Sequence, residues 1–165
     1  RAGRQALGEL RHLLGVLRLD TSGGDDLGPQ PGLAGIPGLA DELTRTGADV
    51  SLTMAPVPAG LSAAVDLSAY RIVQESLTNV IKHAGPNPTV HLTVGVDDVG
   101  LVIDIVNTIS PSGRHEAAGR LPASGYGIAG MRERAALLGG TLTAEPEPPN
   151  RFRVNAHIPL ETERT

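Results

Sequence analysis

The sequence predicts a two-layer α/β sandwich, in which one mixed or antiparallel sheet is covered by helices on one face. Apolar residues recur at helical spacing in four segments, near residues 2–19, 36–46, 62–85 and 128–138. Five shorter segments have the pattern and the flanking turn residues of strands, near 49–54, 89–96, 101–107, 141–145 and 152–158. Helices and strands in this order favour a single sheet with its helices on one face.

The composition fits one domain with an aliphatic core and excludes several kinds of function. The 165 residues are 40% hydrophobic, but only Tyr70, Tyr126 and Phe152 are aromatic. Because there is no cysteine, disulfides, thiol nucleophiles and thiolate metal sites are excluded. A net charge of -4 with so few aromatic residues argues against binding to nucleic acid. No run of 18 apolar residues predicts a membrane span.

Three stretches of different composition predict the domain organisation. Residues 1–19 carry leucines at helical spacing, and the chain starts at Arg1, inside this pattern and without a signal peptide. We therefore interpret the chain as a piece of a longer protein. Residues 20–35 are rich in Gly, Pro and Asp and predict a linker. Residues 36–160 predict the sandwich domain.

Capping residues set the predicted helix boundaries. Gly47 follows the first helix of the domain, and Gly85 followed by proline ends the long second helix. Ser62 and Asp66 are two candidate N-caps for that long helix. A pair of glycines, beginning at Gly139, ends the last helix.

Turn residues separate the strands. The four residues from Asp97 to Gly100 predict a hairpin between the second and third strands, and 145–150 predict the turn between the last two. Residues 109–124 contain Pro, Ser and Gly with few apolar positions. A connection of this length predicts a mobile lid or disorder.

One face of the long helix carries the chemistry. Glu75, Asn79, Lys82 and His83 fall within an arc of about 100°, opposite the apolar face of the same helix. A solvated helix face usually mixes Glu, Lys and Arg at loose spacing. Here an acid, an amide, an ammonium and an imidazole stand in register, and this set can hold a divalent metal together with a phosphate tail.

A second motif has the spacing G-x-G-x-x-G, and consists of Gly125, Tyr126, Gly127, Ile128, Ala129 and Gly130. The dinucleotide-binding fold places this motif directly after its first strand, whereas here it follows a long loop late in the chain. Its glycines would still let backbone N–H groups approach phosphate oxygens at the start of a helix. For the motif alone, the alternative is a flexible loop that leads into a tightly packed helix.

Together the two motifs resemble those of a known family. Residues 74–84 resemble the asparagine box of sensor histidine kinases, and 125–140 resemble their second glycine box. The run Gly-Met-Arg-Glu-Arg-Ala, followed by Leu-Gly-Gly, is similar to the subfamily that pairs with response regulators of the NarL type. Residues 7–18 are similar to the end of that subfamily's second dimerisation helix. The resemblance implies the ATP-binding α/β sandwich shared with gyrase-type ATPases, with a mixed sheet.

The resemblance also implies roles for single residues. Asn79 corresponds to the family's magnesium ligand, and Glu75 to the acid that polarises the acceptor histidine or a metal-bound water. Lys82 corresponds to a phosphate contact, with His83 beside it. The phosphate-cradling turn corresponds to Gly125, Gly127 and Gly130, with Tyr126, Ile128 and Ala129 supplying backbone. ATP and Mg²⁺ are the implied cofactors.

The sequence departs from the family where adenine would bind. The first glycine box normally reads Asp-x-Gly-x-Gly, and its aspartate accepts a hydrogen bond from the adenine amine. Here Asn107 begins the aligned segment, and the glycines of the box are missing. An amide oxygen can accept the same hydrogen bond, but it brings no charge and its orientation must be fixed by its neighbours.

The resemblance places the acceptor histidine on the first dimerisation helix, and none of the five histidines fits that position: His12, His83, His91, His115 and His157. We therefore expect a cytoplasmic catalytic domain of a membrane-anchored sensor kinase, without nucleic-acid or membrane contacts of its own. It would donate the γ-phosphoryl group to a histidine on a dimerisation domain outside this chain, for relay to a NarL-type regulator.

Two other functions remain open at this point. One is a serine kinase of the anti-sigma type on the same fold, against which the dimerisation-helix pattern of residues 7–18 argues. The other is a degenerate kinase that only docks partners, which the altered adenine box keeps open. Loss of Mg-nucleotide binding on substitution of Asn79 would favour the kinase over the docking module.

Overall fold

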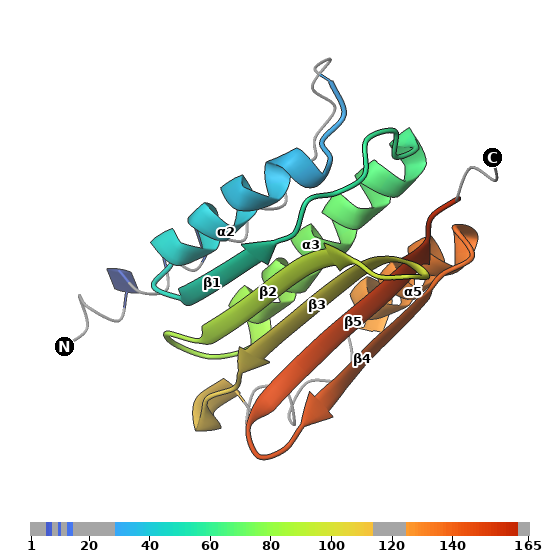
Figure 1. The fold of residues 1–165 in the computed structure, drawn as a ribbon. Coiled ribbons are helices and arrows are strands. Elements are labelled where there is room, and N and C mark those ends of the chain that lie inside the picture. Colours follow the sequence, from blue (N-terminus) through green and yellow to red (C-terminus); the bar gives the residue numbers. More distant parts are fainter. Residues whose placement is uncertain (1–5, 8–9, 11–12, 15–28, 114–124, 162–165) are drawn as a thin grey trace.

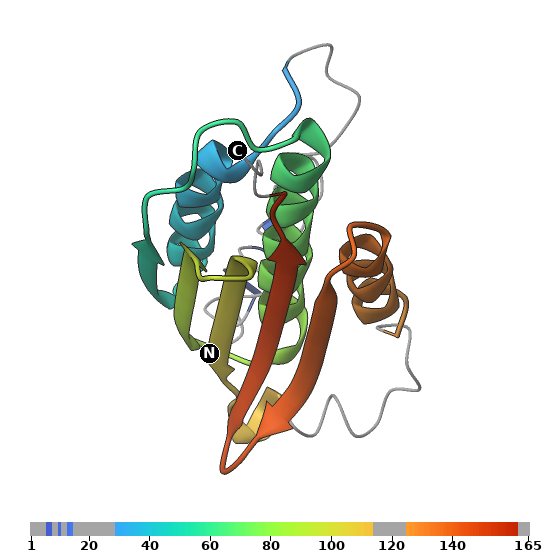
Figure 2. The same cartoon turned by 45° about the vertical axis from the view of Figure 1, so that its right-hand side comes forward.

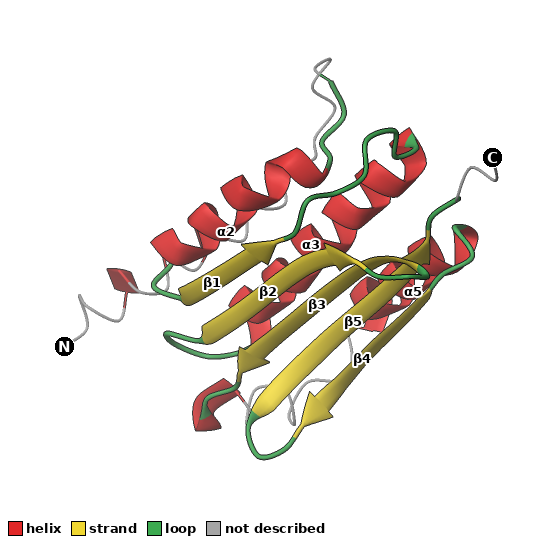
Figure 3. Ribbon diagram, in the orientation of Figure 1, coloured by secondary structure: helices red, strands yellow, loops and turns green. Residues whose placement is uncertain are grey.

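The computed structural model describes residues 6–7, 10, 13–14, 29–113 and 125–161, and it has the predicted two-layer architecture. Its five strands are β1 (Asp49–Met54), β2 (Thr89–Val96), β3 (Gly100–Thr108), β4 (Thr141–Glu147) and β5 (Arg151–Pro159). The helices are η1 (Leu33–Gly35), α2 (Ile36–Arg45), α3 (Ala63–His83) and α5 (Gly125–Leu137). Figures 1 and 3 show that these helices lie on one face of a single sheet.

The sheet is mixed and has the strand order β1-β2-β3-β5-β4. β1 pairs with β2 in parallel, and all other neighbours are antiparallel. A parallel pair needs a crossover connection, and α3 provides it between β1 and β2. The last two strands are longer than predicted, because Glu147 pairs with Arg151 across their turn, with 3.0 Å between Oε2 and Nε.

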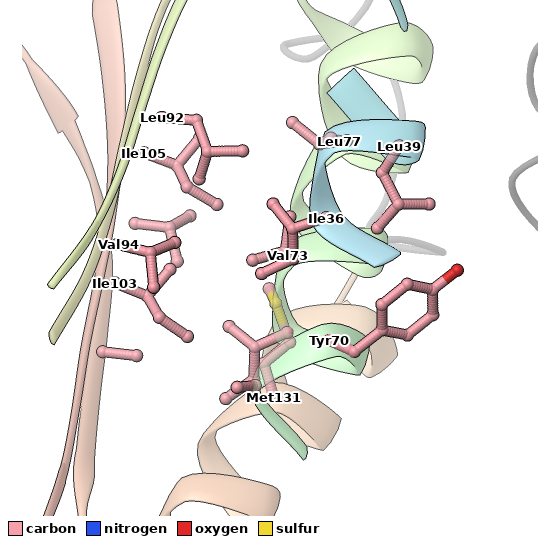
Figure 4. Close-up of a cluster of buried hydrophobic side chains, with 14 of the residues drawn as sticks. Ile36, Leu39, Tyr70, Val73, Leu77, Leu92, Val94, Ile103, Ile105 and Met131 are labelled. Atoms are coloured by element: carbon pink, nitrogen blue, oxygen red, sulfur yellow. The ribbon is translucent and has the colours of Figure 1, made fainter. Parts of the chain in front are cut away.

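The apolar core lies between the sheet and the helices. Alternating apolar residues of β2 and β3 point toward the helices and are no more than 1% exposed. Figure 4 shows the side chains that meet there: Leu92, Val94, Ile103 and Ile105 from the sheet, and Ile36, Leu39, Tyr70, Val73, Leu77 and Met131 from the helices. α2 contacts α3 and β1, whereas α5 contacts α3 and β4, so α3 lies between the two other helices (Figure 2).

Of the two candidate N-caps, Ser62 caps α3. Its hydroxyl accepts a hydrogen bond from Val65 N at 3.2 Å. Asp66 lies one turn further along and accepts instead from Leu33 N, at 2.8 Å. Through this hydrogen bond α3 holds η1, the last part of the predicted linker, and Leu33 is buried in the core.

Most of the N-terminal prediction lies outside the described residues. Within 1–28 only 6–7, 10 and 13–14 are described. These residues are helical, as the leucine spacing predicts, and their leucines are 50–58% exposed. None of the helices in the described part of the chain is long and apolar enough to cross a membrane.

The other face of the sheet is polar and open to solvent. Arg153 of β5 contacts Asp104 of β3 with 2.7 Å between Nε and Oδ1. At the β2–β3 turn, hydrogen bonds from the N–H groups of Val99 and Gly100 lower the pKa of Asp97. The carboxylates of Asp97 and Asp104 are therefore hydrogen-bonded on this face of the sheet.

Candidate functional site

The predicted functional strip lies on the second half of α3, outside the core. Glu75, Asn79 and His83 are half-buried, and Lys82 is exposed. The other residues in this half of the helix, 74, 76–78, 80 and 81, are buried. The helical spacing therefore predicted which side chains in this half of α3 stay outside the core, and their chemical roles stay a prediction.

The glycine motif is helical, which corrects the predicted boundary. α5 begins at Gly125, three residues before the predicted start at Ile128, so the motif occupies the first two turns of the helix and is not a separate turn. Glycine is tolerated there because Ile128 and, one turn on, Met131 pack against the core, and this tertiary packing overrides propensity. The first four N–H groups of a helix have no acceptor within it, and its N-terminus attracts anions. An anion-binding role for the motif stays a prediction. It would now rest on the N–H groups at the start of α5 and not on those of a loop.

α3 and α5 are joined by a specific contact. Ser76 Oγ donates to Ile72 O at 2.7 Å and lies 3.3 Å from Met131 Sδ. Ser76 is 3% exposed and Met131 is fully buried. This contact brings the start of α5 beside the middle of α3. As a result Glu75 and Gly127, from the two predicted motifs, are neighbours.

Asn107 is at the end of β3, on the sheet face that points toward the helices. It alternates with Ile103 and Ile105, and it is only 6% exposed. Its Nδ2 donates to Thr108 O at 2.9 Å. Because the amide nitrogen is engaged, the amide oxygen is left as an acceptor. The hydrogen bond to Thr108 O therefore fixes the orientation of the Asn107 side chain, with its oxygen as the acceptor.

The start of the predicted lid is anchored to the end of α3, a contact that the sequence analysis missed. Ser110 N donates to Ala84 O at 2.8 Å, and Gly113 N donates to Ser110 Oγ at 3.2 Å. Gly85 has a φ of +84°, which turns the chain out of α3 beside this segment. Because Asn107 precedes Ser110 by three residues, the same contact fixes Asn107 near the end of α3. The rest of the predicted lid, 114–124, including His115, lies outside the described residues.

The donor set fits a magnesium ion that is held largely by phosphates. Among the described residues there is no group of three or more His, Asp or Glu side chains that could hold a metal. Glu75 and Asn79 lie one turn apart on α3 and offer a carboxylate and an amide oxygen. Mg²⁺ keeps several waters and is commonly bound by one or two protein oxygens plus substrate phosphates.

The remaining singled-out residues lie away from this region or on the surface. His91 is exposed on β2, and His157 on β5 contacts Asp97, with 3.1 Å between Nε2 and Oδ1. Both histidines are on the polar face of the sheet, opposite the helices. Arg132 and Arg134 are exposed on α5. His12 lies outside the described residues.

The chain matches a known family. Residues 64–162 match the model of the family described as histidine kinase-, DNA gyrase B-, and HSP90-like ATPase. The chain is therefore a member of this ATPase family, and membership implies that it binds ATP.

Individual relatives agree with this assignment. The chain is similar to the sensor histidine kinase YxjM of Bacillus subtilis, with 34% identity over 145 residues, covering 79% of this chain and 31% of that protein. The histidine kinase domain of a blue-light activated histidine kinase from Erythrobacter litoralis EL346 has a TM-score of 0.58 and 18% identity, covering 93% of this chain and 75% of that chain. The ATP binding domain of PrrB from Mycobacterium tuberculosis has a TM-score of 0.51 and 23% identity, covering 74% and 89%. The two structures support the fold alone, and the chain spans about a third of YxjM.

Replacement of Gly113 by alanine tests the anchor of the lid segment. A Cβ at this position would lie 2.6 Å from His83 O and 2.8 Å from Ala84 O. Because both neighbours are backbone, we expect G113A to lower the free energy of unfolding by about 1–3 kcal/mol in urea denaturation. The control is G38A in α2, where nothing lies within 4 Å of the added Cβ. This control should be neutral or stabilising by up to about 1 kcal/mol, and equal effects of the two variants would contradict the anchor.

Proposed function

We propose that this chain is the Mg–ATP-binding catalytic domain of a sensor histidine kinase. One observation carries the proposal: packing brings the Glu75–Asn79 strip of α3 against the N-terminus of α5. A carboxylate, an amide oxygen and a helix start that attracts anions then adjoin one another. Membership of the ATPase family supports the same conclusion independently.

Each part of the site would take one part of the nucleotide. Asn107 would accept from the adenine amine, and the N-terminus of α5 would hold phosphate oxygens. Asn79 would supply a protein oxygen to Mg²⁺, which neutralises charge on the phosphates. Lys82, exposed at the end of the same strip, would contact a phosphate, with His83 beside it. Glu75 would polarise the incoming acceptor or a metal-bound water.

We propose further that the acceptor histidine is on a separate dimerisation domain and that the phosphoryl group passes on to a NarL-type response regulator. His91 and His157 support an external acceptor, because they lie on the opposite face of the sheet from Glu75, while His83 lies on the strip of α3 proposed to contact phosphate. In a kinase of this kind, residues 7–18 would form the end of the second dimerisation helix. Their exposed leucines, such as Leu10 and Leu13, agree with a partner helix at this end.

A degenerate kinase that only docks partners is the second candidate, and the uncharged adenine position favours it. The side chain of Asn107 argues against it. Its amide nitrogen is bonded to Thr108 O, so its oxygen is still able to accept a hydrogen bond from a nucleotide base, and a protein that only docks partners would not need this acceptor. A serine kinase on the same fold would share the nucleotide site and would differ only in the residue that it phosphorylates.

Substitution of Asn79 tests the nucleotide site. We expect titration calorimetry of the chain with ATP and Mg²⁺ to show binding, and N79A to weaken it about 10- to 100-fold, because Mg²⁺ loses its protein oxygen. N155A is the matched control, since Asn155 is also half-buried but bonds Asp104 on the opposite face of the sheet. Absence of binding by the folded wild-type chain at millimolar nucleotide would overturn the kinase proposal. Equal binding by N79A and wild type would favour the docking module.

Substitution of Asn107 tests the adenine subsite. N107L keeps the size of the side chain but removes the acceptor, so ATP binding should weaken about 10- to 100-fold, with little effect on weaker GTP binding. N107D should tighten ATP binding, because an ionised acceptor makes the stronger hydrogen bond. Competition by ATP and GTP against a fluorescent ATP analogue measures both effects. Equal ATP affinity of N107L and wild type would place adenine elsewhere.

A further inference from the structure

We propose that Gly127 is a positioning residue for Glu75, a role that rests on the proposed kinase function. A Cβ built on Gly127 would overlap Glu75 Oε1 and would lie 3.2 Å from Cδ and 3.6 Å from Cγ of the same side chain. The carboxylate of Glu75 therefore lies in the space that the missing side chain of Gly127 leaves. Any other residue at position 127 would displace this carboxylate.

Gly130 is a useful comparison in the same helix. A Cβ at Gly130 would meet only Arg134 Nη1, at 3.7 Å, which is an ordinary van der Waals contact. Both glycines lower the helix propensity of α5, because alanine is the better helix former by about 1 kcal/mol. Only at Gly127 does a side chain from another element require the missing Cβ.

The two helices cannot easily separate to make room for a larger residue. Met131 lies one turn after Gly127 and is fully buried, and Ser76, which follows Glu75, lies 3.3 Å from its sulfur. The contact between Ser76 and Met131 therefore fixes α5 beside α3 next to the overlap. Since the backbones are held, a methyl group at position 127 must move the side chain of Glu75.

This arrangement has a chemical consequence for the proposed reaction. The carboxylate of Glu75 is held at the first turn of α5, where a helix attracts negative charge and where phosphate would bind. The position from which it can reach an incoming acceptor is therefore available only because residue 127 has no side chain. A misplacement of about 1 Å in a reacting group can lower a rate 100-fold. If Gly127 only let phosphate approach, its replacement would lower nucleotide affinity. The size of that effect would not depend on the length of the side chain at position 75.

The test begins with a double-mutant cycle that needs no nucleotide. In thermal unfolding of the chain, G127A should have a Tm about 2–5 °C below that of G130A, because displacement of the Glu75 carboxylate offsets the gain in helix propensity that both substitutions bring. Addition of E75A to both variants should remove most of this difference, because the overlapping carboxylate is gone. G130A should show no such coupling to position 75. If G127A and G130A have the same Tm, or if E75A removes none of the difference between them, Gly127 does not make room for Glu75 and the inference is overturned, whatever the nucleotide experiments show.

The functional arm measures the rate of γ-phosphoryl transfer to a supplied dimerisation domain at saturating Mg–ATP. G127A should lower this rate at least 10-fold, and E75D, one methylene shorter, should be slower than wild type alone but faster in the G127A background than G127A itself. A slow G127A without rescue by E75D, or unchanged transfer by G127A, would contradict positioning. Failure of the wild-type chain to bind ATP would instead reject the proposed function, while the Tm cycle still decides the contact.

Discussion

The burial of α3 between the sheet and two other helices is the interaction on which the rest of the structure depends. Leu77 and Val73 are fully buried on the sheet side, and most of the circumference of the helix is covered. Packing of this extent leaves one strip of α3 for polar chemistry. The candidate site is therefore the strip of α3 that core formation leaves outside the core. It is bordered by α5 and by the start of the lid segment.

Two contacts attach the elements that border the candidate site to this central helix. Ser76 fixes the start of α5 through Met131, and Ala84 fixes the start of the lid segment through Ser110. Both contacts are made by residues directly adjacent to the functional strip. A displacement of α5 or of Ser110 would therefore change the surroundings of Glu75 or His83.

Periodic patterns predicted the long elements and the functional strip, because α3 is regular and its polar residues recur at helical spacing. Other features depend on contacts that periodicity does not encode. Asp66 looked like a cap, but it bonds Leu33, 33 residues away. Glycine at the start of α5 looked like a turn, because propensity ignores the packing of Met131. No local sequence pattern predicts that Gly113 packs against the carbonyl oxygen of His83, a contact that only the folded structure shows.

The most direct test of this account is a crystal structure of the chain with Mg²⁺ and a non-hydrolysable ATP analogue. The account predicts the adenine amine at Asn107 Oδ1, phosphate oxygens at the N-terminus of α5, and the metal on Asn79, with the Glu75 carboxylate still lying over Gly127. A nucleotide bound on another face, or one whose phosphates point away from α5, would contradict it.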